Sequence, residues 1–206
     1  MKFNNPKIKK CNNKTFEECI KDNEYYNAIF VEKPKFDLKY ITFDSCIFEN
    51  IDFTSIKLIE VCLIDVIFKN CDLSNQEFDK QMLSRVKFEN CKLVGTSFID
   101  SSLRDIEFLN CNSKYINFSN AIINNMVIKD SNFSDSTFNE TKIKNISLTN
   151  VEFNKAEFLQ TNLNDIDFSE SDITGIIFDR KSLKGIIIDR FQAHTIVEMF
   201  GVKIKE

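Results

Sequence analysis

The residues best able to do chemistry are seven cysteines and one histidine. Zinc sites usually take cysteines in close pairs such as CxxC, and the sequence has no such pair. His194 has no nucleophile with an orienting acid near it in sequence, so a Ser-His-Asp or Cys-His arrangement is poorly supported. A phosphate-binding glycine loop is also missing from the sequence. We therefore predict a protein that is not an enzyme and that holds no metal and no cofactor.

A five-residue pattern of apolar residues accounts for the placement of several cysteines. From Leu38 to Ile188, 30 of the 31 positions at intervals of five are Phe, Leu or Ile, and Ser113 is the exception. We call these the central positions. Two residues before them stand mostly small or β-branched residues, among them Cys71, Cys91 and Cys111. Residues two apart in an extended chain face the same side, so each pair is expected to point inward.

A corner must separate successive inward pairs, because the next pair begins three residues later and would otherwise face the wrong side. Two residues after the central positions, from Tyr40 to Gly185, 18 of 30 residues are Asn, Asp or Gly. These residue types best tolerate the positive φ that the third residue of a type II turn requires. The pattern therefore predicts an all-β solenoid of polygonal cross-section, without specifying the corner angle.

The repeat resembles that of the pentapeptide repeat proteins. This resemblance implies a right-handed quadrilateral β-helix with 20 residues per turn, hence nearly eight coils and a rod of roughly 37 Å at about 4.8 Å per coil. Cys71, Cys91 and Cys111 would then stack in one column, within the distance range of disulfides. We nevertheless expect reduced, buried thiols that pack as small apolar side chains, because the cytosol keeps thiols reduced.

The limits of the pattern predict three parts, namely an irregular N-terminal coil or cap (1–37), the β-helix (38–188) and a C-terminal helix and dimerisation module (189–206). In the first part, Ile20, Tyr25 and Phe30 keep the interval of five in an offset register, and we expect a small loop around residues 31–35 with Pro34. Within the repeats, residues 111–115 (CNSKY) are expected to bulge slightly.

The segment 189–206 carries the signals of a short helix. Asp189 and Gln192 stand at the spacing of a capping box, and Gly201 fits the residue that follows a helix C-terminus. Val202 and Ile204 then alternate as in a short terminal strand. We expect this module to close the open end of the solenoid core and to join two rods end to end. Its expected interface residues are Phe191, Ile196, Val197, Phe200, Val202 and Ile204.

The charge of the chain limits the classes of partner. A formal charge of −4 and a pI near 5.3 argue against general nucleic-acid binding. The N-terminal sequence has no apolar run, so we expect no signal peptide, no membrane span and a cytoplasmic location. Counting in twenties from Leu38 gives one outward face with eight acids against four bases. The candidate contact residues on this acidic face are Glu60, Glu77, Asp79, Asp100, Glu140 and Glu157.

Two segments resemble the Qnr quinolone-resistance proteins, a branch of the pentapeptide repeat family. Residues 182–206 (SLKGIIIDRFQAHTIVEMFGVKIKE) resemble the C-terminal Qnr module, and residues 67–78 (IFKNCDLSNQEF) resemble its repeats. The resemblance implies a dimeric rod of DNA-like size and charge that binds DNA gyrase or topoisomerase IV and shields it from fluoroquinolones. The inserted loops of many Qnr members are absent, as in MfpA. The alternative is a structural or scaffold rod with a different protein partner.

Overall fold

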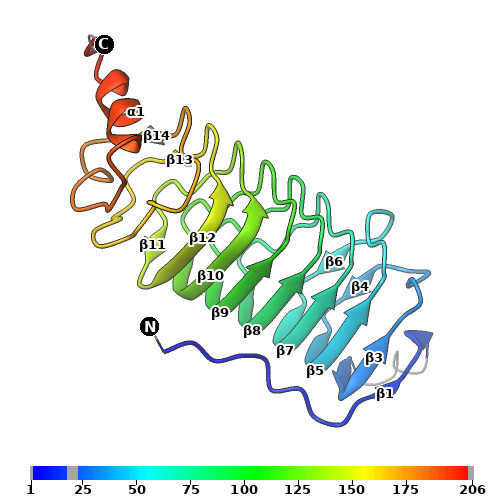
Figure 1. The fold of residues 1–206 in the computed structure, drawn as a ribbon. Helices are drawn as coiled ribbons and strands as arrows, with labels where there is room; N and C mark the ends of the chain where they lie inside the picture. The colour runs from blue at the N-terminus through cyan, green and yellow to red at the C-terminus, as the bar shows by residue number, and fades with distance from the viewer. Residues whose placement is uncertain (1, 18–22, 204–206) are drawn as a thin grey trace.

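The computed structural model describes residues 2–17 and 23–203, and it shows a rod of stacked coils that ends in a short helix (Figure 1). The fold is the predicted parallel β-solenoid of about eight turns. The first strands are β1 (Asn12–Asn13), β2 (Glu24–Tyr26), β3 (Ala28–Phe30), β4 (Leu38–Lys39), β5 (Thr42–Glu49), β6 (Leu58–Ile59) and β7 (Cys62–Lys69). They are followed by β8 (Met82–Glu89), β9 (Ser102–Leu109), β10 (Ile122–Asn132), β11 (Lys142–Ile143), β12 (Ile146–Glu152), β13 (Glu157–Phe158), β14 (Ile177–Phe178) and the helix α1 (Gln192–Met199).

All strand pairs are parallel, and from β4 onward paired residues are 20 positions apart, as in Phe48↔Phe68 and Phe88↔Phe108. The main sheet runs in the order β1-β3-β5-β7-β8-β9-β10-β11, while β2 pairs with β5 and β12 pairs with β10. Each coil contains four central positions, so the solenoid has four sides. We name each side after one of its central residues: Phe43, Phe48, Phe53 or Phe78.

The corners have the backbone conformation that the sequence predicts. Every corner position from Tyr40 to Gly185 has a positive φ except Ser55, Asn145, Glu170 and Arg180. The corner between the Phe43 and Phe48 sides bends least, because the eight-residue strands β5, β7, β8 and β9 continue through it. Two sides therefore form one bent sheet.

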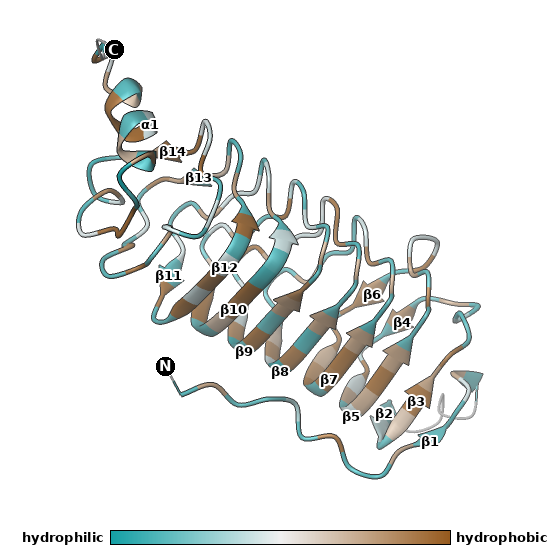
Figure 2. Ribbon diagram, in the orientation of Figure 1, coloured by the Kyte–Doolittle hydropathy of each residue, from teal (hydrophilic) through white to brown (hydrophobic). Residues whose placement is uncertain are grey.

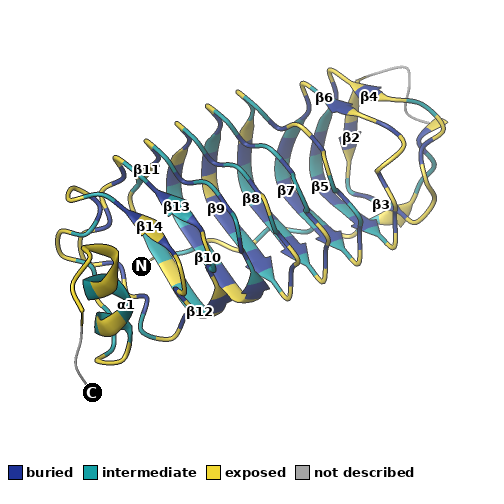
Figure 3. Ribbon diagram, turned by 90° about the horizontal axis from the view of Figure 1, so that it is seen from above, coloured by how far each residue is buried: buried dark blue, intermediate teal, exposed yellow. Residues whose placement is uncertain are grey.

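The core is a narrow column of stacked side chains. Phe68, Phe88 and Phe108 lie ring over ring, with centroids 5.2 and 5.0 Å apart. Apolar and polar residues alternate along the strands (Figure 2), and the buried residues line the inside of the coils (Figure 3). Ser113 fills its central position fully buried and keeps the regular pairing between coils, so the predicted bulge at residues 111–115 does not form.

The sheet begins before the periodic segment. β2 and β3 pair with β5 so that Tyr25 lies beside Phe43 and Phe30 beside Phe48, in a coil slightly shorter than those that follow. Residues 31–37 form no strand, as expected for a small loop around residues 31–35, and within this loop Pro34 is buried. Phe16 stacks on Phe30 at 4.3 Å between centroids and covers the open end of the core. Ile20, which we expected in this coil, lies outside the described residues.

The C-terminal helix has the predicted ends. The Asp189 carboxylate accepts hydrogen bonds from the amides of Phe191 and Gln192, and the Gln192 side chain accepts one from the Asp189 amide. Gly201 has a φ of 73° and follows the helix, as expected. Val202 belongs to no strand, in contrast to our expectation of a terminal strand, and Ile204 lies outside the described residues. No helix in the described chain is long and apolar enough to span a membrane.

The ladder of backbone hydrogen bonds between coils is interrupted at two places. Residues 57–61 and 77–81, all of them described, form no backbone–backbone hydrogen bond with each other. The same holds between residues 142–149 and 162–169. The second interruption spans two sides of the solenoid, and at its corner Asn145 lacks the positive φ. Its central residues Ile143 and Leu148 are only half-buried.

Candidate partner-binding face

The six candidate acids all belong to the Phe78 side of the solenoid or to its corner. Glu60, Glu77, Asp100 and Glu140 are exposed, whereas Asp79 and Glu157 are half-buried. Because each coil stacks about 4.8 Å above the last, Glu60 and Glu140, four coils apart, span roughly 19 Å along the rod. Glu60, Asp100 and Glu140 share one corner column, which also contains the exposed Lys80, and Glu77 lies on the adjoining side.

The two half-buried acids are occupied within the solenoid. Asp79 accepts hydrogen bonds from the Ile99 amide at 2.8 Å and from the Ser97 hydroxyl. Glu157 accepts one from the Asn139 side chain at 3.0 Å. A carboxylate that already satisfies a backbone N–H is less free to contact a partner, and its loss leaves that N–H without an acceptor. We therefore assign the accessible charge of this face to the four exposed acids.

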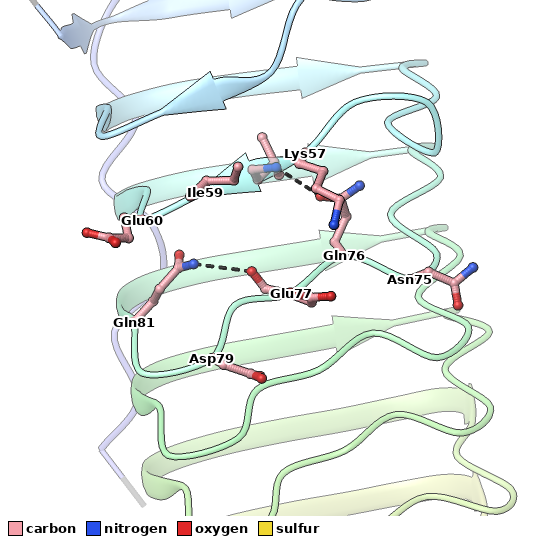
Figure 4. A pocket seen from close by; sticks show the side chains of 9 residues that line it. Lys57, Ile59, Glu60, Asn75, Gln76, Glu77, Asp79 and Gln81 are labelled. Carbon is pink, nitrogen blue, oxygen red and sulfur yellow. Dashed lines mark hydrogen bonds between the residues drawn. The ribbon is translucent and has the colours of Figure 1, made fainter.

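Gln76 fills the first interruption of the ladder on this face (Figure 4). Its side-chain oxygen accepts from the Leu58 amide at 3.0 Å, and its nitrogen donates to the carbonyls of Phe53 at 3.0 Å and Ile56 at 2.8 Å. The amide side chain thus replaces backbone partners that the next coil supplies elsewhere. Because its side-chain amide makes three hydrogen bonds within the solenoid, Gln76 has a structural role in this face.

A cleft opens where the two coils separate. Its volume is about 160 Å³, and Lys57, Glu60, Glu77 and Asp79 are among the residues that line it (Figure 4). A second cleft of about 430 Å³ continues around the corner. It is lined in part by Glu60, Asp79, Cys62 and Met82, and Met82 is 68% exposed. Acidic rims beside an exposed apolar side chain suit a basic or amphipathic group of a protein partner.

Several of the cysteines pack inside the solenoid, whereas the histidine is exposed. Cys71, Cys91 and Cys111 are buried in one column, and each thiol donates to a carbonyl of the preceding coil at 3.4 Å. The six cysteines within the described ranges are free. His194 is exposed on α1, and its Nδ1 lies 3.4 Å from Glu198 one helical turn away.

The expected dimer residues divide into two groups. Phe191, Phe200 and Val202 are exposed, at 72%, 57% and 52% of their surface. Ile196 and Val197 are half-buried, and Ile196 packs against the solenoid core. Ile204 lies outside the described residues. The helix therefore both covers the end of the core and leaves aromatic side chains facing solvent.

Sequence reasoning missed two features. Gln76 replaces the usual small or β-branched residue two positions before Phe78, and that exception was a readable signal. The second is residues 2–11, which run along the outside of the rod past β5 to β10 (Figure 1). No periodic pattern marks those residues, and we expected them in a terminal coil or cap.

Comparisons with known proteins identify the repeat. A family model described as Pentapeptide repeat region matches residues 61–132. Another, described as Pentapeptide repeats (8 copies), matches residues 37–75 and 131–169. A search of curated proteins finds no match.

Solved structures similar to this chain include three pentapeptide repeat proteins. A trypsin-treated variant of QnrB1, a plasmid-mediated fluoroquinolone resistance protein, is 17% identical over 89% of this chain and 100% of its own, with a TM-score of 0.40. HetL, from the cyanobacterium Nostoc sp. strain PCC 7120, is 16% identical over 80% and 89%, with a TM-score of 0.42. A thylakoid-lumen protein from Arabidopsis thaliana is 21% identical over 57% and 68%, with a TM-score of 0.33.

Proposed function

Because the chain belongs to the pentapeptide repeat family, we propose that it is a non-catalytic binding protein whose partner is a type II DNA topoisomerase. The partner would be gyrase or topoisomerase IV, and the complex would protect that enzyme from fluoroquinolones in the cytoplasm. The observation that carries the proposal is the group of four exposed carboxylates on the Phe78 side and its corner, Glu60, Glu77, Asp100 and Glu140. The Qnr-like sequence of residues 182–206 supports the choice of partner.

Charge alone does not make this rod equivalent to DNA. Over roughly 37 Å, B-DNA carries about 22 phosphates. The Phe78 side carries eight acids against four bases, and four of those acids, Asp37, Asp79, Glu157 and Asp179, already accept hydrogen bonds within the solenoid. Shape must therefore supply much of the fit, while the exposed acids set the approach and orientation of the partner.

A charge reversal on the exposed acids tests the proposal. We expect Glu60→Lys, Glu77→Lys and Asp100→Lys together to leave the fold intact, because these side chains are exposed and none occupies an inward position. Binding to gyrase, measured by biolayer interferometry at low salt, should fall at least about tenfold, since close charge pairs govern association. Asp79 is left unchanged because it holds the Ile99 amide.

A matched triple reversal at Glu24, Asp165 and Glu170 changes the charge equally, at exposed positions off the acidic face. This control should retain binding. If both triple variants lost gyrase affinity equally, the loss would follow from net charge alone, and the acidic face would have no specific role. Wild-type protein that bound neither topoisomerase, and gave no recovery of supercoiling in ciprofloxacin, would favour a scaffold rod with another protein partner.

We also propose that α1 joins two rods. The exposed fractions of Phe191 and Phe200 leave apolar surface at the end of the rod, where a second copy would cover it. Large aromatics usually carry much of the energy of such interfaces.

A further inference from the structure

The N-terminal arm, residues 2–11, lies along the corner between the Phe43 and Phe48 sides and is hydrogen-bonded to its residues. The corner residues beneath it are spaced by one coil each and come from β5, β7, β8, β9 and β10: Ser45, Asp65, Arg85, Asp105 and Asn125. The arm has no regular structure over residues 2–9 and follows the rod axis across five coils (Figure 1). We call this corner column the arm groove.

The groove holds the arm chiefly through backbone atoms of the arm. The Lys7 amide donates to Asp65 at 2.7 Å, and the Lys7 carbonyl accepts from Ser45 at 3.3 Å. Further along, Asp105 accepts from the Asn4 amide at 3.3 Å, and Asn125 donates to the Lys2 carbonyl at 3.2 Å. Asn4 adds one side-chain bond to Asp105 at 2.9 Å. Recognition of backbone atoms accepts many sequences, as in other extended-peptide sites.

Charge and burial show which peptides the groove suits. Four of the ten arm residues are lysine and none is acidic. The two acids of the groove are buried beneath the arm, and Asp65 also pairs with Arg85 through two bonds of 2.6 and 2.7 Å. Asp105, in contrast, receives hydrogen bonds from Asn4 and Asn125 only. A buried carboxylate needs such donors, so the groove favours an extended, positively charged chain.

The arm buries little apolar surface of its own. No residue from 2 to 10 is fully buried, and Phe3, Pro6 and Ile8 are only half-buried. Ordering a residue of extended chain costs about 1–2 kcal/mol, and here little apolar burial offsets it. The arm can therefore leave the groove without disturbing the core.

The groove continues beyond the arm. The next members of the corner column are Asn145 and the exposed Asp165, and there the second interruption of the ladder opens. A cleft of about 280 Å³ at this point is lined in part by Ile146, Leu148 and Asp165. The same cleft is also lined by Asp167 and Glu170, so a longer basic peptide could follow the arm's path and place a lysine side chain there.

We propose that the arm groove is a docking site for an extended, lysine-rich peptide segment of a partner protein, and that the arm occupies it in the absence of that partner. The site lies on a different corner from the acidic face, so this proposal does not depend on the proposed topoisomerase function. Occupation by the arm lowers the apparent affinity for a competing peptide in proportion to the fraction of time that the groove is filled.

The test uses the full chain and a fluorescent peptide with the arm sequence KFNNPKIKK. A Lys7→Pro variant loses the backbone N–H that donates to Asp65, so the arm should be released. The peptide should then bind to the variant at least about tenfold more tightly than to wild type. Asn4→Asp, which places a carboxylate against Asp105, is a second release variant that leaves the solenoid unchanged. Faster tryptic cleavage of the arm reports its release.

Two controls fix the site. Adding Asp105→Asn to the Lys7→Pro variant should weaken peptide binding at least about fivefold, whereas adding Asp135→Asn, at another corner, should not. A peptide with glutamate in place of lysine should bind poorly, because it meets the groove acids. The proposal is overturned if released arms leave peptide binding at the wild-type level. Dimerisation of the release variants through exchanged arms would also overturn it, by assigning the groove to a second copy.

Discussion

Gln76 allows a sharp test of whether its side chain repairs the separation of two coils or causes it. In the repair hypothesis, Gln76→Leu keeps the side-chain volume but removes all three hydrogen bonds. The Leu58 amide and the Ile56 carbonyl are then left without a partner, whereas the Phe53 carbonyl keeps its bond from the Ile56 amide at 3.1 Å. Each unsatisfied buried group costs about 1–3 kcal/mol, so with two such groups the variant should lose roughly 2–6 kcal/mol of unfolding free energy.

The measurement is urea unfolding followed by far-UV circular dichroism, with a matched change one coil further along. Thr96 occupies the equivalent inward position and makes one side-chain bond, to the Leu73 carbonyl at 2.9 Å. Thr96→Val should therefore cost only about 1 kcal/mol. In the coils that Thr96 joins, the backbone ladder is regular, with Phe78 donating to Ser97 at 2.8 Å. A Gln76→Leu variant at least as stable as wild type would refute the repair hypothesis, because the coils would then close into that ladder once the glutamine is removed.

Three further predictions concern the core, the thiols and the C-terminal module. Phe108→Ala should lower the free energy of unfolding in urea by about 3–5 kcal/mol, as truncation of a buried phenylalanine usually does. Lys144→Ala, at an exposed position, should change it very little. Equal losses in the two variants would contradict the five-residue pattern. Burial raises the pKa of the Cys111 thiol to about 12, so a thiol reagent should label Cys111 far more slowly than half-buried Cys62. Mass spectrometry measures both rates, and both thiols should react rapidly after unfolding. Stoichiometric bound zinc would contradict the assignment of these thiols to core packing. Phe200→Asp should shift a dimer toward monomer in sedimentation velocity with an unchanged circular dichroism spectrum, and a wild type that is monomeric at micromolar concentration would exclude the dimer.

The sequence predicts the repeating part of the structure because every coil must satisfy the same local constraints. Central residues such as Phe88 have to fill the column, and corner residues such as Asn90 have to accept a positive φ. The second interruption of the backbone ladder could not be predicted in this way, because Ile143 and Leu148 continue the apolar pattern although their coil separates from the next. Their separation depends on pairing between coils, which an apolar pattern does not encode.

The candidate site was predictable in outline only. Counting in twenties places the acids on one side, but it cannot show that Asp79 is held by the Ile99 amide while Glu77 remains exposed. The arm was unpredictable for a different reason. Its contacts use its own backbone atoms, and the groove acids Asp65 and Asp105 look in the sequence like ordinary corner residues.

We expect the separation between residues 142–149 and 162–169 to divide the rod into two cooperative unfolding units. In a solenoid, stability is a sum over neighbouring interfaces, so the chain opens first where an interface is incomplete. Residues 161–203 remain joined to the longer unit through the other two sides, where Phe153 donates to Asp172 at 2.7 Å and β13 pairs with β14. In native-state hydrogen exchange, this last unit should open as a group at a lower free energy than β7 to β9. A dimer assembled through α1 would then be held by the less stable unit of each rod, so partner binding that bridges the separation would strengthen the dimer as well.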